Sequence, residues 1–591
     1  MIECAIKTQW ALLGATFIAI CSFLPLYLAP ASVAEIVKPL FVVLAVSLGL
    51  SWILALCQTT TFGNFILKEA VPGGAMKDPY DTKLYHKFEK FLTLLIKRRF
   101  VTLTTVFVTL VLSLVIMAVM PQSFFPKMNK PYFRADLVFP EGFSIHAVDQ
   151  DVMKVEDYLK NHEKVKSYSV TLGGTPLRYY LASSSFGPKS NYANVMVETK
   201  DPEDAAEVEQ QFYEHMTQNF PNIITRSALF ALSPVPEAAI EIGFIGENPD
   251  TLTALVERAK KIARQCDMVT DIRSNWGDKV PVWKPMFSQQ KGLRLGITRQ
   301  QVANSFRTAT NGLPLGEYRE GDVSLPILLK DEDVEKMNLN DVKSVPVFST
   351  KGNSVKVEQV IDNFALGYDY NVVRRFNRER CMMMQCEPKR GANTMAAFKQ
   401  VLTAVQEQMQ LPEGYKMKYF GEQETQDVSN AALAKNIPLT FLLIYVVLLF
   451  LFPSNYRKPV LIMLMLPLVF IGVVWGLLLF GKSLDFFAIL GLLGLIGMNI
   501  KNAIVLDDEI GLQLKDGKGA VPAVVEATKT RIVPVTMASG TTILGMLPLL
   551  GDAMFAGMAA TIMGGLFVST VLTIFVLPVT YCIFFKIRAD R

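Results

Sequence analysis

One stretch of the sequence carries a charged side chain inside an apolar segment. Between Asp485 and Asp507 lie about twenty residues, enough for one helix to cross a bilayer core, and this segment contains the cation Lys501. A lysine in hydrocarbon costs at least about 2.5 kcal/mol unless another group compensates its charge. The residue therefore either pairs with buried acids, as in a proton relay, or extends its amine to the membrane surface.

Two features of the sequence bear on this choice. Small residues precede Lys501 at spacings of three and four: Gly491, Gly494 and Gly497. Such a face admits a close neighbouring helix, which would direct the cation at protein. Against this, Lys501 lies only about 9 Å along a helix from Asp507, and a lysine can extend its amine toward the surface. The residues alone leave both interpretations open.

The composition indicates a membrane protein with a large soluble part. Of the 591 residues, 51% are hydrophobic, and the mean hydropathy is positive. The net charge is only +5, with the basic residues in particular loops, so nucleic-acid binding is not indicated. Seven cysteines without a CxxC pair and four histidines without a cluster predict no metal centre. No nucleophile elbow or phosphate loop is present, so no enzymatic chemistry is expected.

Hydropathy predicts an α-helical polytopic membrane protein with about eight transmembrane helices. Residues 121–430 contain no span and alternate strand-like with amphipathic helical runs, which predicts an extracytoplasmic α/β module of β-α-β type with an insert. Lysine and arginine gather in the loops expected to be cytoplasmic. The expected spans are 10–29, 39–57, 101–120, 437–453, 458–480, 485–508, 533–551 and 557–585. The expected strands are 132–139, 165–172, 192–199, 238–245, 381–387 and 415–420, and helices are expected at 201–220 and 250–266.

The run RCMMMQCEP places Cys381 and Cys386 around three methionines. Consecutive residues of a strand face opposite sides, so these two cysteines cannot both line one site. A stripe in the core of a sheet is therefore favoured over a soft-metal site.

The two ends of the chain resemble each other. Residues 1–57 align without a gap with residues 524–580, and Leu-Pro-Leu occurs at 24–26 and again at 547–549. Both copies are expected to cross in the same direction, as in the parallel repeats of many transporters. By this symmetry we expect roughly 420 further residues before Met1, in a complete protein of about a thousand residues with twelve spans.

Motifs near the C-terminus resemble the last three transmembrane helices of resistance-nodulation-division (RND) transporters, nearest to the hydrophobe/amphiphile multidrug efflux branch. These motifs are GLIGMNIKNAIVLDDEI, KDGKGAVPAVVEATKTRIVPVTMASGTTILGMLPL and GGLFVSTVLTIFVLPV, and the resemblance extends over the whole chain. It implies the C-terminal part of a homotrimeric inner-membrane proton/drug antiporter with a large periplasmic domain, which exports hydrophobic or amphiphilic small molecules. Its partners would be a periplasmic adaptor, an outer-membrane channel and the lipid bilayer. The proton gradient would drive it without a cofactor.

The resemblance also implies a domain organisation. Residues 1–58 would hold family helices five and six, 59–99 a cytoplasmic linker, 100–120 helix seven and 431–591 helices eight to twelve. Between them would lie a first porter subdomain at 121–235, a second at 236–287 and 376–430, and a funnel or docking insert at 288–375.

Residue by residue, the resemblance assigns a proton relay. Lys501 matches the lysine that pairs with two aspartates of the fourth helix, and Asn502 follows it as in the family. Protonation of such aspartates releases the lysine and shifts helix packing. Arg531 matches a basic residue at the cytoplasmic mouth of the eleventh helix. The family's threonine falls at Ala538, and the nearby hydroxyls that can replace it are Ser539, Thr541 and Thr542.

The expected substrate wall is an aromatic segment in the first subdomain. It contains Tyr179, Tyr180, Phe186 and Tyr192. These rings either border the drug pocket, where flexible aromatic walls accept varied ligands, or pack at the subdomain edge. Two other functions remain open: a heavy-metal cation pump, suggested by the 25 methionines, and a non-transporting membrane assembly or lipid-handling relative.

Overall fold

The computed structural model describes most of the chain, which divides into two compact units. One unit is Met1–Asn275 together with Arg375–Arg591, and the other is Trp276–Arg374. The described residues are 2–29, 32–66, 80, 82–123, 125, 128–179, 187–230, 237–331, 341–349, 352–453 and 455–587.

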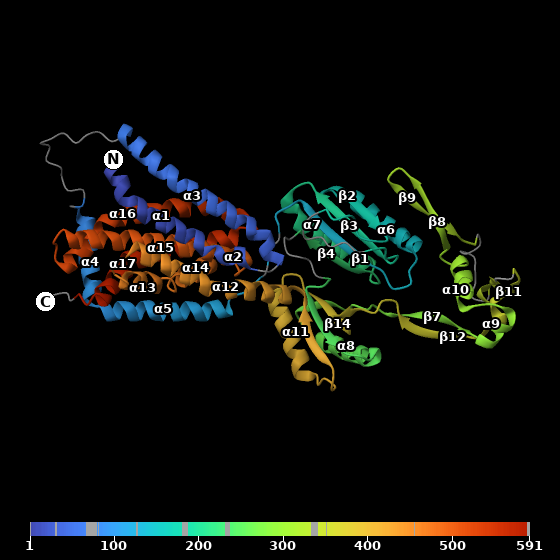
Figure 1. Ribbon diagram of the computed structural model, residues 1–591. Coiled ribbons are helices and arrows are strands. Elements are labelled where there is room, and N and C mark those ends of the chain that lie inside the picture. The colour runs from blue at the N-terminus through green and yellow to red at the C-terminus, as the bar shows by residue number, and fades with distance from the viewer. Residues whose placement is uncertain are drawn as a thin grey trace. The chain divides into compact units, whose positions relative to one another are not determined.

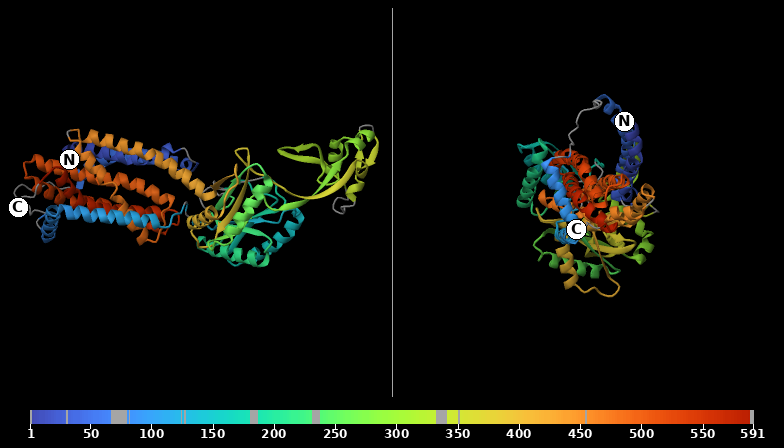
Figure 2. Two further views of the ribbon diagram at one scale, coloured as in Figure 1. Left: turned by 90° about the horizontal axis from the view of Figure 1, so that it is seen from below. Right: turned by 90° about the vertical axis from the view of Figure 1, so that its left-hand side faces the viewer.

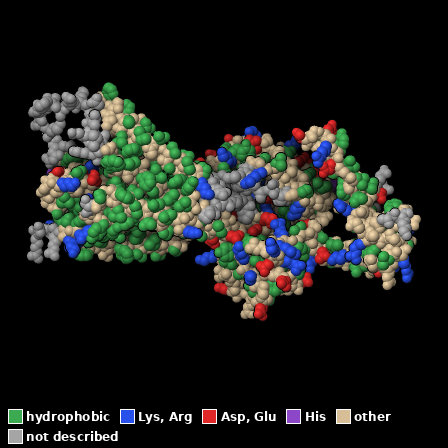
Figure 3. Space-filling view, viewed as in Figure 1, with side chains coloured by type: hydrophobic (Ala, Val, Ile, Leu, Met, Phe, Trp, Pro, Cys, Tyr) green, Lys and Arg blue, Asp and Glu red, His purple; other side chains and the backbone are tan. Residues whose placement is uncertain are grey.

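Eight helical segments of the described residues are long and apolar enough to cross a membrane. Figures 1 and 2 show these helices side by side, and Figure 3 shows hydrophobic side chains over the face they present. The helices of this part are α1 (Ile2–Ser22), α2 (Leu24–Leu28), α3 (Ser32–Ile66), α4 (Lys83–Lys97), α5 (Arg99–Val119), α12 (Gly421–Leu451), α13 (Arg457–Leu464), α14 (Val469–Leu479), α15 (Phe486–Lys515), α16 (Ala520–Met546), the short 3-10 helix η5 (Leu547–Gly551) and α17 (Ala556–Phe584).

The two sequence repeats break their first helix at the same place. α2 begins at Leu24 and η5 begins at Leu547, and each has a proline in its first turn. A proline is tolerated there because the first N–H groups of a helix have no intrahelical partner. The Leu-Pro-Leu triplets thus end corresponding helices, α1 and α16.

Helix α15 packs closely against two other helices. Its first turn is capped by Asp485, whose Oδ1 accepts a hydrogen bond from the Ala488 backbone N–H at 2.7 Å. A Cβ at Gly497 would lie 2.8 Å from the Cα of Ala19 in α1, and a Cβ at Gly491 would lie 3.0 Å from the carbonyl oxygen of Met558 in α17. The expectation that these glycines admit close neighbours is confirmed.

One boundary of this helix was expected in the wrong place. The span expected from the sequence ends at residue 508, but α15 continues to Lys515 and Asp507 is 0% exposed. The Asp-Asp-Glu run does not end the helix because neighbouring helices cover two of its three carboxylates, Asp507 and Glu509.

The first sheet has the antiparallel order β2-β3-β1-β4. Its strands are β1 (Tyr132–Val138), β2 (Val165–Leu172), β3 (Tyr192–Thr199) and β4 (Ile224–Leu229), and its helices are α6 (Ile145–Lys160) and α7 (Ala205–Asn219). The strands expected at 165–172 and 192–199 are confirmed at both ends. Valines of α6 at spacings of three and four, Val148, Val152 and Val155, face the core because they form one helical stripe.

The second sheet repeats this order as β6-β14-β5-β15. Its strands are β5 (Ile240–Ile245), β6 (Val269–Ser274), β14 (Glu379–Pro388) and β15 (Lys416–Phe420), with β13 (Arg375–Phe376) beside β14 and helices α8 (Pro249–Ala263) and α11 (Thr394–Gln408). β15 leads directly into α12 at Gly421. This glycine has a φ of +80°, and a Cβ there would lie 2.7 Å from the carbonyl oxygen of Ala239. Strand and membrane helix are thus joined without a loop.

The unit Trp276–Arg374 lies between the second and third strands of this sheet in sequence. It begins earlier than the expected residue 288 because β7 (Lys279–Phe287) pairs along its length with β12 (Ile361–Tyr370). Its other elements are α9 (Gln289–Leu295), α10 (Arg299–Thr308), β8 (Leu313–Glu320), β9 (Val323–Leu329), β10 (Pro346–Phe348) and β11 (Ser354–Lys356).

Glu241 in the centre of the second sheet predicts a pH-dependent stability. Burial raises its pKa from 4.5 to about 7, against the hydrogen bonds that it accepts from Gln385 and the Ala238 N–H. Between these two pH values the folded protein holds a proton that the unfolded chain has released, so stability falls as pH rises through this window. We expect the free energy of unfolding of the purified wild-type protein to fall between pH 4.5 and 7, by on the order of 3 kcal/mol because of this group. Thermal unfolding measures this change.

The matched comparison is Glu241→Gln, which keeps the side-chain shape and cannot ionise. Its melting temperature should fall less than that of the wild type over the same pH range, because the other buried acids remain in both proteins. Equal pH slopes for the two proteins would contradict this prediction.

Candidate proton-relay site

Helices α15, α16 and α17 bring together a polar cluster inside the apolar bundle. Its members are Asn499, Asn502, Ser539, Thr570 and Thr573, and all are buried. The Thr570 hydroxyl lies 2.6 Å from Ser539 Oγ and 2.7 Å from the Leu566 carbonyl oxygen. A hydroxyl has one proton, so when Thr570 donates to the carbonyl, Ser539 must supply the proton between the two hydroxyls.

Longer contacts extend this cluster to α15. Asn502 Nδ2 lies 3.5 Å from Ser539 Oγ, and Thr573 Oγ1 lies 3.5 Å from Asn499 Oδ1. Both distances are at the upper limit for a hydrogen bond, so these groups can tighten or separate with a small helix shift. The cluster therefore links three helices through polar contacts that can form or break.

Lys501 lies next to this cluster in sequence but points out of the described bundle. Its side chain is exposed, and within the described ranges no carboxylate approaches its Nζ to the 4.0 Å of an ion pair. The expectation that the cation faces protein is therefore not met by these residues. The neighbouring helix α16 also leaves apolar side chains exposed, among them Val533, Met537 and Leu544.

The structure selects one hydroxyl of the three that the sequence proposed. Thr541 and Thr542 both donate to the Ala538 carbonyl oxygen of their own helix at 3.0 Å, so they do not reach Asn502. Ser539 contacts both Asn502 and Thr570. Thr541 and Thr542 lie outside this cluster, because a helix turns by about 100° per residue and puts them on other faces. Their assignment to the proton relay stays a prediction.

This geometry predicts unequal effects of removing the hydroxyls. If the chain takes part in the proton-driven efflux that the resemblance implies, Ser539→Ala should lower that efflux about fivefold, because it removes a buried hydrogen bond worth about 1 kcal/mol between the moving helices. Thr541→Ala should leave transport unchanged, since its hydroxyl is exposed and bonds only within its own helix. Dye-efflux rates at matched expression compare the two, and an equal loss in both variants would contradict the assignment of Ser539.

Arg531 forms an ion pair with a carboxylate that the sequence reasoning did not single out. Its Nη2 lies 2.5 Å and its Nε 3.1 Å from Glu509 Oε2, so both guanidinium nitrogens share one oxygen. Gln513 donates to the other oxygen at 2.9 Å. The pair joins α16 to the last turns of α15. The acid was visible in the Asp-Asp-Glu run, but its partner lies on another helix and could not be identified from spacing.

The expected substrate residues are only partly described. Tyr180 and Phe186 lie outside the described residues. Tyr179 is partly exposed, and its ring centroid lies 5.9 Å from that of Phe230. Tyr192 is 3% exposed and donates to Asp136 Oδ1 at 2.6 Å. Its ring is buried on the face of the first sheet opposite the core residues Ala193 and Val195, because consecutive strand residues face opposite sides. Its assignment to a substrate wall stays a prediction.

The cysteine and methionine run of β14 is also part of a sheet core. Cys381, Met382, Met384 and Cys386 are all buried. Burial raises the pKa of the Cys381 thiol to about 11 and that of Cys386 to about 12, which disfavours the thiolate form that binds metals.

The model of one protein family, described as the AcrB/AcrD/AcrF family, matches residues 1–585. The chain belongs to this family. The AcrB/AcrD/AcrF family lies within the RND superfamily, so the superfamily predicted from the C-terminal motifs is confirmed. Its members are membrane transporters.

Several AcrB/AcrD/AcrF relatives are similar to this chain. The nickel and cobalt resistance protein CnrA of Cupriavidus metallidurans is 27% identical over 360 residues, which cover 59% of this chain and 33% of CnrA. The multidrug export protein AcrF of Escherichia coli (strain K12) is 23% identical over 604 residues, covering 98% of this chain and 57% of AcrF. An X-ray structure of a heavy metal efflux pump matches with a TM-score of 0.77 at 17% identity, over 97% of this chain and 58% of that one.

The chain thus spans between 33% and 58% of the length of these three proteins. The structural match shows that it has the RND transporter fold, with membrane-compatible helices and mixed α/β parts. One named relative is a metal-resistance protein and another a multidrug exporter, so the hydrophobe/amphiphile branch stays a prediction.

Proposed function

We propose that this chain forms part of a proton-driven efflux transporter, with eight transmembrane helices in a bacterial inner membrane and its α/β part in the periplasm. The observation that carries the proposal is an exposed lysine, Lys501, beside a buried polar cluster in helices long enough to span a membrane. Lys501 has no carboxylate partner among the described residues, and a cation inside a membrane is costly unless an opposite charge compensates it. We propose that this partner is a pair of carboxylates on polypeptide beyond these 591 residues.

The transport cycle then follows from charge pairing. Carboxylates beside Lys501 stay ionised until protons arrive from the outer side. Protonation cancels their attraction for the lysine, and the released helix can shift against its neighbours. The long contacts from Asn502 to Ser539 and from Thr573 to Asn499 are where α15 can move. No cofactor is needed, because the proton gradient supplies the energy.

Hydrophobic or amphiphilic small molecules are the proposed substrates, and a homotrimer with a periplasmic adaptor and an outer-membrane channel is the proposed assembly. The similarity to AcrF supports this substrate class. Heavy-metal export is the second candidate, supported by the similarity to CnrA and to a heavy metal efflux pump structure. The burial of the cysteine and methionine run favours the first candidate, because those sulfur atoms pack in a sheet rather than line a path.

The experiment is expression of the complete transporter in cells that lack their own efflux pumps. We expect energised cells to export a hydrophobic dye, a protonophore to stop this export, and survival in nickel, cobalt or copper to stay unchanged. Protection against the metals without dye export would favour the metal pump. If the cells showed neither dye export nor metal protection, that result would support the non-transporting relative and contradict the proposal.

A further inference from the structure

Besides the pair of Arg531 and Glu509, the helix bundle holds another ion pair. Its carboxylate is more deeply buried than Lys501. Asp507 on α15 is 0% exposed, and its Oδ2 lies 2.8 Å from Nζ of Lys458, whose side chain is 15% exposed. The same amine donates to the backbone carbonyl oxygen of Asp507 at 3.3 Å. Within the described part of the chain, neither carboxylate oxygen accepts a hydrogen bond of normal geometry. The acid is thus held by one cation and almost nothing else.

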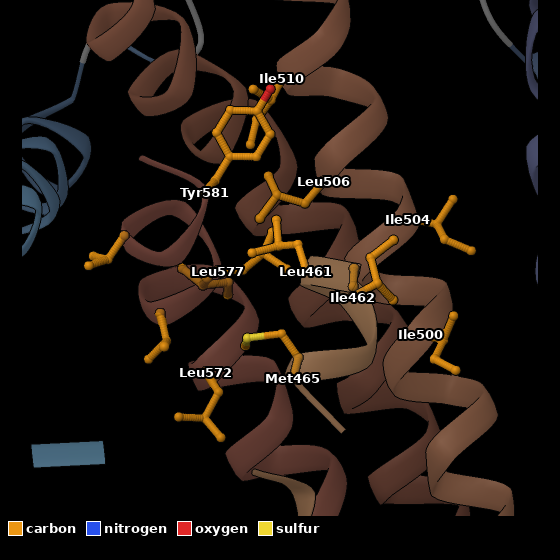
Figure 4. Packing of buried hydrophobic residues seen from close by; sticks show 14 of the residues in the cluster. Leu461, Ile462, Met465, Ile500, Ile504, Leu506, Ile510, Leu572, Leu577 and Tyr581 are labelled. Carbon is orange, nitrogen blue, oxygen red and sulfur yellow. The ribbon is translucent and has the colours of Figure 1, made fainter. Parts of the chain in front are cut away.

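The surroundings of Asp507 are mostly apolar. Figure 4 shows Leu506 and Ile510, its neighbours on α15, packed in a hydrophobic cluster with Leu461 and Tyr581. The charged or titratable groups that face Asp507 are Lys458 from α13, Tyr581 from α17 and Asp508 on its own helix. Directly after α12, the centroid of the Phe452 ring lies 5.1 Å from the Lys458 amine, and on α16 Arg531 is already paired with Glu509.

Stability alone does not account for this pair. Desolvating two charges costs about as much as their attraction returns, and buried ion pairs replaced by apolar side chains of similar volume are often neutral or stabilising. A membrane-embedded acid with one partner is therefore a candidate for function rather than for packing.

Lys458 also lies close in sequence to helix α12, which leads to the second sheet. It is the second residue of α13, just after the corner that follows α12. The other end of α12 begins at Gly421, directly after β15, and β15 is hydrogen-bonded to β5 in the second sheet. A displacement of Lys458 can therefore be transmitted along one helix to a sheet outside the membrane.

We propose that Asp507 exchanges a proton during the transport cycle, and that its ion pair with Lys458 couples the charge of α15 to the position of α12. This inference rests on the proposed proton-driven efflux. When a proton from the gradient binds the carboxylate, Asp507 becomes a neutral acid and Lys458 loses its counter-charge. The amine, already partly exposed, then moves toward water. Release of the proton to water restores the carboxylate and the pair.

The test compares two double variants of the complete transporter, reconstituted in liposomes with an imposed pH gradient. Each variant is called a neutral pair because it replaces both members of one ion pair with uncharged side chains. Asp507→Asn with Lys458→Met removes both buried charges and leaves none unpaired, and Asp151→Asn with Lys154→Met does the same to an exposed pair on α6. We expect the buried neutral pair to keep the wild-type melting temperature and to lose proton-driven dye efflux at least tenfold. We expect the exposed neutral pair to transport normally.

Wild-type transport by the buried neutral pair would overturn the inference, because it would show that Asp507 and Lys458 only pack. If that double variant does not fold, Asp507→Glu replaces it. We then expect the pH at half-maximal efflux to shift, and an unchanged pH profile would overturn the inference. An active wild type with an inactive Lys501→Ala variant and an active buried neutral pair would refute this inference alone. A wild type without proton-driven efflux would refute the proposed function as well.

Discussion

Replacing Lys501 with alanine is expected to reduce proton-driven efflux by the complete transporter to the level of cells without it. The reason is that, under the proposed mechanism, Lys501 is the cation of α15 that the facing carboxylates attract until they are protonated. The fold should persist, because Lys501 is exposed and is not part of the apolar packing among the described residues. An exposed substitution of this kind changes stability by about 0.5 kcal/mol or less.

The matched control is Lys515→Ala, in the last turn of the same helix, where the side chain is also exposed. It removes an equal charge near the helix end and should leave efflux unchanged. Dye export and melting temperature are measured for both variants. Full activity of Lys501→Ala would contradict the relay role, and loss of activity in both variants would indicate a general effect of charge.

Removing the cation of the Arg531 pair is expected to destabilise the helix bundle. In Arg531→Met, Gln513 is the one partner that the Glu509 carboxylate keeps among the described residues, in a site where Glu509 is 9% exposed. Uncompensated buried charges cost about 3–5 kcal/mol, and partial exposure of the arginine reduces this to about 2 kcal/mol by solvent screening. We expect a lower melting temperature and weaker efflux.

Rescue distinguishes the ion pair from a requirement for arginine itself. Arg531→Met combined with Glu509→Gln leaves no unpaired charge and should recover most of the lost stability. If the double variant is as unstable as Arg531→Met, the arginine stabilises the helices by other contacts and this account of the pair is wrong.

The sheets were predicted well from the sequence because their signals are local. Short runs rich in β-branched and aromatic residues predict strands at 165–172 and 192–199, and the structure has both at these bounds. The insert was harder to delimit. Its first strand, β7, pairs with a segment more than seventy residues later, and composition near residue 279 does not mark that pairing.

The candidate site was predicted in its residues but not in its geometry. Asn502 and the hydroxyls of α16 were named from the sequence, but the contact of Asn502 with Ser539 rather than with Thr541 or Thr542 depends on how α16 is rotated against α15 and α17. Helices that are apolar on all sides carry little periodic signal of rotation. The Lys458 partner of Asp507 was missed for a related reason, because the two lie on different helices and only packing brings them together.

The most direct test of the account is the distance from Lys501 Nζ to the nearest carboxylate in a structure of the complete transporter. The account predicts a carboxylate within about 4 Å, the range of an ion pair, contributed by polypeptide outside these 591 residues. An amine that instead lies among lipid headgroups and water, with no carboxylate in reach, would contradict the relay and with it the proposed coupling of protons to export.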